Sequence, residues 1–235
     1  MISAAGVIVP AHNEQSLLPD CLRALRTAAA MAAVPARIVV VADACTDDTA
    51  GLARAAGAHV ITIQARNVGV ARAAGAESLL RRFAAAEPDR LWLATTDADT
   101  IVPADWLARH VDYADQGYDV VLGTVGISAW DEHPPHVPAA FAARYAFGAG
   151  PHPHVHGANF GIRASAYQLA GGFRPLSSGE DHALRSAAVG SGCRVVHATD
   201  IEVITSARRQ ARASRGFSDL LKRLAAGDTE PDLTG

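Results

Sequence analysis

Two spacings of apolar residues alternate along the first 120 residues. Short β-branched runs predict strands at 6–9, 37–41, 59–63, 91–94 and 119–122. Between them, Ala-, Leu- and Arg-rich segments with helical spacing predict helices at 17–33, 48–56, 70–86 and 103–116. The strands are continuous apolar runs, which is typical of strands covered on both faces. The alternation therefore predicts an α/β fold with a mostly parallel central sheet and helices on both faces.

The pattern changes after residue 125. Residues 128–158 hold five prolines and five histidines around one predicted helix at 139–147, and a long irregular segment of this kind is typical of a lid or binding loop. Regular structure is expected to return at 155–162. It continues with helices at 164–170, 181–190 and 214–226 and strands near 194–197 and 202–204. We interpret residues 1–235 as a single domain, with halves at 1–125 and 126–205 and a C-terminal arm and tail at 206–235.

Composition narrows the class of protein. A chain of 235 residues is long enough to bury a sizeable core, and a formal net charge of −3 excludes a globally basic nucleic-acid-binding protein. The three cysteines lack a CxxC spacing, which excludes a disulfide framework and a zinc ribbon. Neither a charged leader nor an apolar run of about 18 residues is present. We therefore expect a cytoplasmic protein without a transmembrane segment.

The stretch from 206 to 226 is basic. It holds Arg208, Arg209, Arg212, Arg215, Lys222 and Arg223 against Asp219. Such an arm could close over a diphosphate, bind an anionic acceptor or touch the inner face of an anionic membrane as a peripheral contact. The alternative is a helix face exposed to solvent.

Polar residues gather where the predicted strands end. In an open parallel sheet, ligands bind beyond the carboxyl ends of the strands. The residues found there are Pro10, Ala11, Asn13 and Glu14 after the first strand, Asp43 after the second, Arg66 and Gly69 after the third, and Asp97, Ala98 and Asp99 after the fourth. Because the glycine motifs of dinucleotide-binding proteins and P-loop NTPases are absent, the sequence favours neither class.

Asp97-Ala98-Asp99 is the sharpest of these features. In extended backbone, residues two apart project the same way, so both carboxylates could meet one cation that prefers oxygen ligands. Mg²⁺ and Mn²⁺ are held in this way by one or two carboxylates together with substrate phosphates. The alternative is that Asp97 lies in a turn and that Asp99 caps the helix after Pro103.

Several motifs, taken in order, resemble GT-A-fold glycosyltransferases of family 2 over about residues 5–205. They are VIVPAHNE at 7–14, Asp43 with TDDT at 46–49, NVGVAR at 67–72, DAD at 97–99, GANFGIR at 157–163, GGF at 171–173 and EDHALR at 180–185. The resemblance implies a metal-dependent enzyme, most simply a hexosyltransferase, that uses Mn²⁺ or Mg²⁺. It would move one sugar from a nucleoside diphosphate-sugar to an acceptor hydroxyl, inverting by a single displacement.

The resemblance also implies roles on the donor side. The loop after the first strand and Asp43 would hold the nucleoside, although Asp43 could instead cap a helix. Asp99 would bind the cation, with Asp97 facing the ribose or donor sugar. Near Gly69, Arg66 or Arg72 would contact phosphate, the alternative being surface ion pairs. His197 is the candidate third metal ligand.

On the acceptor side, the resemblance implies that the acidic pair Glu180-Asp181 is catalytic, with Asp181 as the general base. An acceptor hydroxyl is a poor nucleophile until its proton is removed; the alternative is that acids simply favour the first turn of a helix. His156, Gly157 and Asn159 would line the acceptor site with this pair. The run His152-x-His154-x-His156 would direct three imidazoles one way if extended, so zinc binding is an alternative role for it.

Two other functions remain open. One is a catalytically silent protein that binds sugar nucleotides. The other is a sugar-1-phosphate nucleotidyltransferase, which would need a glycine-rich basic loop after the first strand, whereas residues 10–14 are neither. The Gln-x-x-Arg-Trp motif of processive family members is absent, so polymer synthesis is not favoured.

Overall fold

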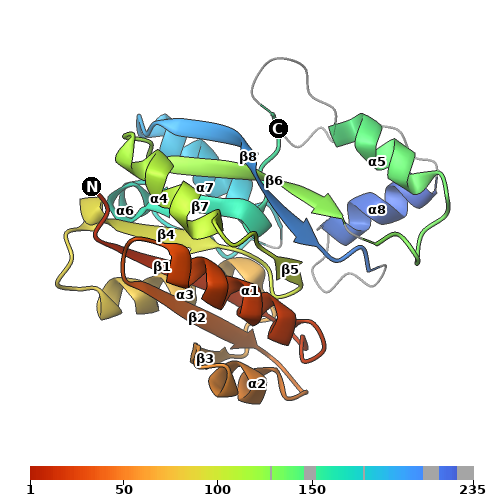
Figure 1. Ribbon diagram of the computed structural model, residues 1–235, viewed down its shortest axis with the longest axis horizontal. Helices are drawn as coiled ribbons and strands as arrows, with labels where there is room; N and C mark the ends of the chain where they lie inside the picture. The colour runs from red at the N-terminus through yellow and green to blue at the C-terminus, as the bar shows by residue number, and fades with distance from the viewer. Residues whose placement is uncertain (128, 146–151, 177, 209–216, 227–235) are drawn as a thin grey trace.

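The structure is a computed structural model that describes residues 1–127, 129–145, 152–176, 178–208 and 217–226. Its centre is an eight-stranded mixed sheet with strand order β3-β2-β1-β4-β7-β6-β8-β5 (Figure 1). The strands are β1 (Ala4–Ala11), β2 (Ala36–Asp43), β3 (His59–Ile63), β4 (Leu91–Thr95), β5 (Thr100–Ile101), β6 (Val120–Ile127), β7 (Phe160–Arg163) and β8 (Val195–Thr205).

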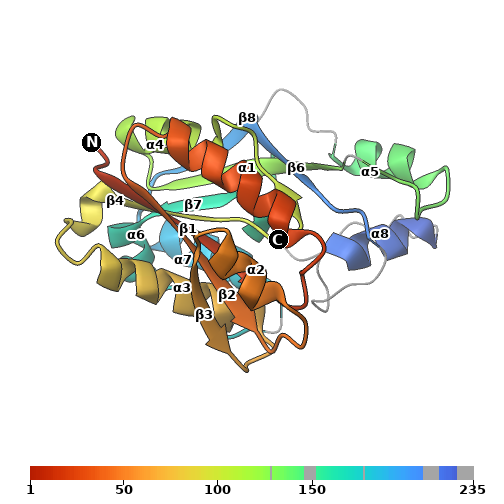
Figure 2. The ribbon, with the colours of Figure 1, turned by 60° about the horizontal axis from the view of Figure 1, so that its bottom comes forward.

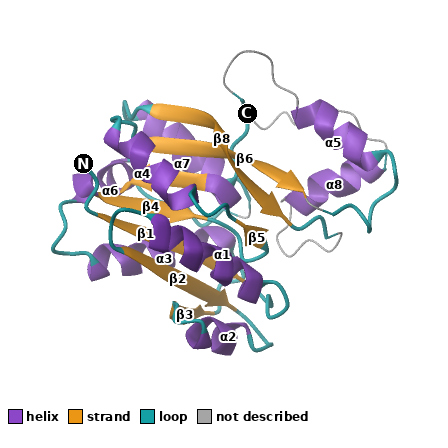
Figure 3. Cartoon of the chain, in the orientation of Figure 1, coloured by secondary structure: helices purple, strands orange, loops and turns teal. Residues whose placement is uncertain are grey.

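Helices cover both faces of this sheet (Figures 2 and 3). The helices on the sheet are α1 (Leu18–Met31), α2 (Thr49–Ala55), α3 (Val68–Arg82), α4 (Trp106–Asp115), α6 (Ala164–Leu169) and α7 (Glu180–Gly190). Two more, α5 (Val137–Tyr145) and α8 (Phe217–Ala225), lie apart from it, and η1 (Pro88–Arg90) and η2 (Gly157–Asn159) are short 3₁₀ turns. The predicted α/β class with helices on both faces is confirmed. Among the described residues, no helix combines the length and apolar character needed to cross a membrane.

Strand β1 shows why its sequence is a continuous apolar run. Val7 and Val9 point to the face packed by α1 and α4, whereas Ile8 points to the opposite face, packed by α3, α6 and α7. Since each successive side chain enters a different core, no position is left for a polar residue. The four strands β3, β2, β1 and β4 run parallel, as expected of βαβ units.

The second half of the sheet departs from the expected pattern. Strand β7 runs antiparallel to both neighbours, β4 and β6, and the short β5 runs antiparallel to β8. The strands expected near 194–197 and 202–204 form the single strand β8, which pairs with β6 through a register shift opposite Leu122 and Thr124. The regular structure expected at 155–162 consists of the 3₁₀ turn η2 followed by strand β7.

One helix of the irregular insert packs against the helix of the C-terminal arm. Helices α5 and α8 pack on each other through Val137, Phe141, Leu221 and Leu224, and they lie beyond the ends of β6 and β8 (Figures 1 and 2). The predicted helices at 139–147 and 214–226 are thus present as α5 and α8; their residues 146–147 and 214–216 fall outside the described residues. The two helices lie beside the strand ends, where a donor site is expected.

The packing of α3 on the sheet generates a stability prediction. A Cβ at Gly75 would lie 2.6 Å from Ile8 Cγ2 and 3.2 Å from Val41 Cγ2, so Gly75→Val should destabilise the fold by about 1–3 kcal/mol through overpacking. Gly190→Ala is the matched control, because a Cβ there meets nothing within 4 Å. Urea denaturation measures both. Equal stability of Gly75→Val and the wild type would contradict this close packing.

Candidate active site

The loops after β1 and β2 are tied together by hydrogen bonds. The His12 ring Nδ1 lies 2.7 Å from the carbonyl oxygen of Asp43, and Asn13 Oδ1 accepts from the Thr46 amide at 2.7 Å. The Glu14 amide donates to Thr49 Oγ1 at 2.7 Å. The structure therefore brings the loop at 10–14 and Asp43 together at one edge of the sheet, as predicted.

Three successive loops at this edge hold strained backbone. Asn13, Ala44 and Arg66 have φ values of 56°, 50° and 50°, and they follow β1, β2 and β3 respectively. Non-glycine residues rarely adopt this region unless their surroundings impose it, and such residues cluster at ligand sites. The edge predicted to hold the donor is thus preorganised by its own loops.

Asp43 has a structural task that the sequence did not reveal. Its Oδ1 accepts from the amides of Ala65 and Arg66 at 2.7 and 2.9 Å, and its Oδ2 accepts from the Asn67 amide at 2.8 Å. The buried carboxylate thereby organises the loop after β3 rather than capping α2. Since two carboxylate oxygens offer about four acceptor sites, one site on Oδ2 is left for a ligand.

Arg66 and Gly69 lie at the entrance of α3. The Arg66 side chain is exposed, and it forms no ion pair within the part of the chain that the structure describes, which leaves both of its predicted roles open. A Cβ at Gly69 would lie 2.2 Å from the carbonyl oxygen of Arg174. Glycine is therefore needed where the loop before α7 crosses α3.

Arg72 is neither a surface residue nor an open phosphate ligand. Its buried guanidinium donates to Thr95 Oγ1 at 3.2 Å, to Asp97 Oδ1 at 2.7 Å and to Glu180 Oε1. Burial alone would lower the pKa of Arg72, but the nearby carboxylates raise it above its ordinary value. Arg72 is therefore not a surface ion-pair residue; its buried guanidinium links Asp97, in the first half of the chain, to Glu180, in the second.

The acids of the Asp-x-Asp motif have different partners. One Asp97 oxygen accepts from Arg72, whereas Asp99 Oδ2 lies 3.0 Å from Nη2 of Arg208. Burial raises the pKa of Asp99 to about 6 in spite of Arg208, which opposes the shift. Ala98 is buried between them and packs with the α1 and α4 core.

Arg208 is the one residue of the predicted basic arm that the structure places at the site. Its Nη1 and Nη2 donate to the two carboxylate oxygens of Glu14 at 2.7 and 2.6 Å. Arg209, Arg212 and Arg215 lie outside the described residues. Lys222 is exposed and Arg223 half-buried on α8. The arm therefore contributes at least one charge next to Asp99.

Glu180 and Asp181, which begin α7, have different environments and roles. Glu180 is 3% exposed and pairs with Arg72, so it is an internal ion-pair partner rather than an acceptor contact; burial raises its pKa although Arg72 opposes this. Asp181 is half-buried, and its Oδ2 accepts from the Gly157 amide at 2.7 Å. Of the pair, only Asp181 remains a candidate base.

The rings of the histidine run 152–156 lie on one side, stacked on one another. The rings of His152 and His154, and of His154 and His156, are stacked with centroids 5.8 Å apart. Stacked rings direct their in-plane nitrogen lone pairs side by side rather than toward one ion. Among the described residues, no three His, Cys, Asp or Glu side chains are grouped to hold a metal, so zinc binding at this run is not supported.

His156 directly precedes Gly157, whose amide donates to Asp181 Oδ2 at 2.7 Å. Its Nε2 is hydrogen-bonded to the Tyr145 hydroxyl. Burial lowers the pKa of His156 to about 3, although the Asp181 charge opposes this shift. The imidazole is therefore neutral, and a neutral ring beside a carboxylate can position a hydroxyl without competing for its proton.

Asn159 does not line the acceptor site. Its side chain is fully buried, and Oδ1 accepts from Trp106 Nε1 at 2.9 Å. Its Nδ2 donates to the carbonyl oxygens of Thr124 and Ile201 at 2.8 and 2.9 Å. With its hydrogen-bonding capacity used inside the core, Asn159 instead joins α4 to β6 and β8.

His197 does not join the aspartates. It lies on β8, in register with Leu122 of β6, and its ring packs edge-on against His152 with centroids 5.1 Å apart. Because no three metal-ligating side chains converge among the described residues, the prediction of His197 as a third ligand beside Asp97 and Asp99 is wrong for this structure.

Comparison with known proteins identifies the family. The model of "Glycosyl transferase family 2" matches residues 6–169. The chain belongs to glycosyl transferase family 2. A relative, undecaprenyl-phosphate 4-deoxy-4-formamido-L-arabinose transferase of Klebsiella pneumoniae, is 35% identical over 129 residues, or 53% of this chain and 37% of the relative. This family 2 chain thus aligns with little more than a third of such curated relatives.

Solved structures give the same fold. TarS of S. aureus in complex with UDP-GlcNAc has a TM-score of 0.64 at 17% identity, covering 96% of this chain and 66% of that one. The mannosyltransferase PcManGT of Pyrobaculum calidifontis, in complex with GDP-Man and Mn²⁺, has a TM-score of 0.63 at 20% identity, covering 97% and 63%. The family 2 chain therefore has the GT-A fold that its motifs implied.

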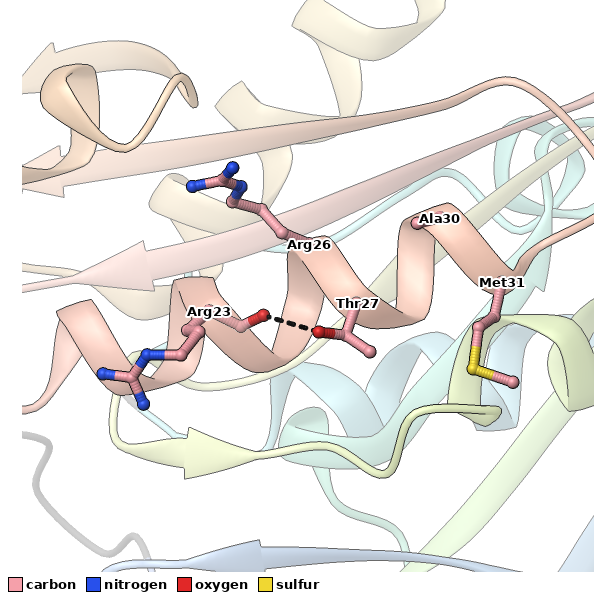
Figure 4. Close-up of a pocket in the computed structure, with 5 residues that line it drawn as sticks. All are labelled: Arg23, Arg26, Thr27, Ala30 and Met31. Carbon is pink, nitrogen blue, oxygen red and sulfur yellow. Dashed lines mark hydrogen bonds between the residues drawn. The ribbon is translucent and has the colours of Figure 1, made fainter.

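A shallow hollow elsewhere on the family 2 chain lies apart from this chemistry. It is lined by Arg23, Arg26, Thr27, Ala30 and Met31, all from α1 (Figure 4). The Thr27 hydroxyl donates to the Arg23 carbonyl oxygen at 3.2 Å. With neither an acid nor a free nucleophile in it, the hollow adds nothing to the site.

The buried Arg72 generates a second prediction. Arg72→Met leaves Glu180 buried without its counter-charge, so it should cost about 3–5 kcal/mol of unfolding free energy. Arg109→Met removes an exposed arginine paired with Asp105 and Asp200; because water screens these charges, it should lower the free energy of unfolding far less than Arg72→Met does. Denaturant unfolding compares the two. Similar losses would show that the Arg72 ion pairs are not a structural link.

Proposed function

We propose that this chain transfers one sugar from a nucleoside diphosphate-sugar to an acceptor hydroxyl, with Asp181 as the general base. One observation carries the proposal: Arg72 bridges Asp97, in the donor motif, to Glu180, which is next to Asp181. The acids suited to hold a donor and the acid suited to activate an acceptor are thereby held in one cluster. In a silent binding protein, Asp181 would serve only the first turn of α7 and the Gly157 amide, and its replacement by asparagine would leave no activity to lose.

The donor half of the proposal rests on the preorganised edge of the sheet. The backbone at Ala11 and Asn13, the remaining acceptor site of Asp43 and the exposed Arg66 would hold the nucleoside and its phosphates. The names of two structural neighbours, one with UDP-GlcNAc and one with GDP-Man and Mn²⁺, support a nucleotide-sugar as the donor class.

The residues at this edge also fit a divalent cation. Asp99 and the second oxygen of Asp97 offer the carboxylate ligands that Mn²⁺ and Mg²⁺ accept, with substrate phosphates completing the shell. When bound, the cation would neutralise charge on the departing diphosphate. Two carboxylates suffice for this role, so it needs no contribution from His197.

Backbone amides orient the Asp181 carboxylate and still leave it able to accept a proton. Its Oδ2 accepts from the Gly157 amide at 2.7 Å and its Oδ1 from the His182 amide at 2.8 Å, which leaves further lone pairs on both oxygens. As the acceptor oxygen bonds to the anomeric carbon and the bond to the diphosphate breaks, its proton would pass to Asp181. A single displacement of this kind inverts the anomeric centre.

One comparison favours a second acceptor class. The curated relative named above takes its name from undecaprenyl phosphate, and the exposed Lys222 on α8 gives the arm a charge suited to an anionic acceptor. A phosphate oxygen is already ionised at neutral pH, so its attack needs no general base. The two acceptor classes therefore differ in how strongly they depend on Asp181.

Asp181→Asn tests the base. The amide keeps the size of the side chain but cannot take the proton, so kcat toward a hydroxyl acceptor should fall about 10²–10⁴-fold while donor binding stays near wild type. Asp105→Asn, at an exposed ion pair on α4, is the matched control. Turnover within a few-fold of wild type would move the base elsewhere or favour a phosphate acceptor; a product of retained configuration would overturn single displacement.

Donor binding has its own test. UDP-, GDP- and TDP-sugars should raise the thermal midpoint of unfolding, because a ligand at a hundred times its Kd adds about 2.7 kcal/mol of stability. If Mn²⁺ strengthens donor binding, the rise should be larger with Mn²⁺ than with EDTA. Asp99→Ala should remove this metal-dependent part. Equal shifts with Mn²⁺ and with EDTA in the wild type would argue against a metal-assisted donor site.

A further inference from the structure

Arg208 lies three residues beyond β8, yet it reaches the loop after β1. Its guanidinium donates to both carboxylate oxygens of Glu14, and Nη2 also lies 3.0 Å from Asp99 Oδ2. The three side chains are 19%, 5% and 13% exposed. A positive charge of the chain itself therefore sits against the carboxylate that would hold a divalent cation.

The two arginines of the site each bridge two acids. Arg72 bridges Asp97 and Glu180, and Arg208 bridges Glu14 and Asp99. Carboxylates crowded in a partly buried site need a counter-charge, and Arg208 supplies one to Asp99 without any metal. A divalent cation at Asp99 would place a second positive charge beside Nη2 of Arg208.

Resting on the function proposed above, we propose that Arg208 and the divalent cation compete for Asp99, so that metal binding releases Arg208 from this carboxylate. Arg208 is a guanidinium latch that holds the metal-free site. Arg72 cannot play this part, because it is buried on α3 with all three of its contacts internal. Arg208 can, because it lies outside any helix or strand, three residues after β8, and its side chain is 19% exposed.

Contacts around Arg208 supply a built-in reporter of its release. The carbonyl oxygen of the preceding residue, Ala207, is hydrogen-bonded to His133 Nε2. The His133 ring packs edge-on against Trp130 with centroids 5.9 Å apart. Trp130 is half-buried, whereas Trp92 and Trp106 are fully buried. A shift of the connection at Arg208 should therefore change the fluorescence of Trp130.

The direct test measures Mn²⁺ binding without nucleotide, by the electron paramagnetic resonance signal of the free ion. Arg208→Gln removes the competing charge and should bind Mn²⁺ about fivefold or more tightly than wild type, within the usual range of coupling between sites. Arg23→Gln removes an arginine that is 73% exposed on α1 and should leave the Mn²⁺ affinity unchanged. Equal or weaker affinity in Arg208→Gln overturns the latch.

Fluorescence provides the second measurement, which does not rely on the stability of one variant. In wild type, Mn²⁺ should shift the tryptophan emission with the same midpoint as ion binding, and Trp130→Phe should abolish the shift. Wild-type protein that binds Mn²⁺ without any such shift overturns the release of Arg208. Arg208→Lys, which keeps the charge but loses the two-pronged contact with Glu14, should have an intermediate Mn²⁺ affinity.

These outcomes separate the latch from the proposed function. Sugar transfer that proceeds equally with EDTA, together with no Mn²⁺ binding by any variant, overturns the latch and leaves the transferase proposal standing. Tighter Mn²⁺ binding by Arg208→Gln in a protein that transfers no sugar supports the latch and refutes the proposed function. An arginine serving only donor phosphates would lower nucleotide affinity when removed and leave Mn²⁺ affinity unchanged, which also overturns the latch.

Discussion

The ion pairs of Arg72 are the interaction on which the site depends. A guanidinium that is 4% exposed joins Thr95 at the end of β4, Asp97 in the following loop and Glu180 at the start of α7. A buried charge is stable only while its partners stay in place, so the donor and acceptor halves cannot separate without exposing it. Residue 157 must be glycine for the same reason, because a Cβ there would lie 2.3 Å from Arg72 Nη2 and would displace the guanidinium.

Much of the fold could be predicted because each helix and strand is marked by the spacing of apolar residues within its own segment. The first half follows βαβ rules, and β3 was predicted at its observed limits, 59–63. Strand direction is not encoded by the spacing of apolar residues, so the antiparallel direction of β7 was not predicted. β8 was divided in two because Asp200 interrupts its apolar run; Arg109 and Tyr113 of α4 satisfy that carboxylate at 2.8 Å each.

At the site, the sequence identified acids better than it identified their partners. Asp43, Asp99 and Asp181 lie where strand ends and a helix start were expected. Their partners come from far along the chain, as with Glu14 and Arg208, which are 194 residues apart, and no local pattern reports such pairs. Asn159 shows the converse error: a polar residue in a matching motif was assigned to a ligand, whereas its hydrogen bonds fasten the core.

The difference in burial between Arg72 and Arg208 explains why one is held in place and the other can exchange its contacts. Breaking the contacts of Arg72 would leave a charge where water cannot replace the lost hydrogen bonds, so its place is set once by folding. Arg208 sits at the rim, where solvent or phosphate oxygens can take over its contacts. Asp97 and Glu180 thus meet a counter-charge fixed by the fold, whereas Glu14 and Asp99 meet one that can be exchanged. The fixed charge, Arg72, holds the reacting groups in place. The exchangeable one, Arg208, balances the negative charges of Glu14 and Asp99, so the chain can fold before any cation or donor is bound.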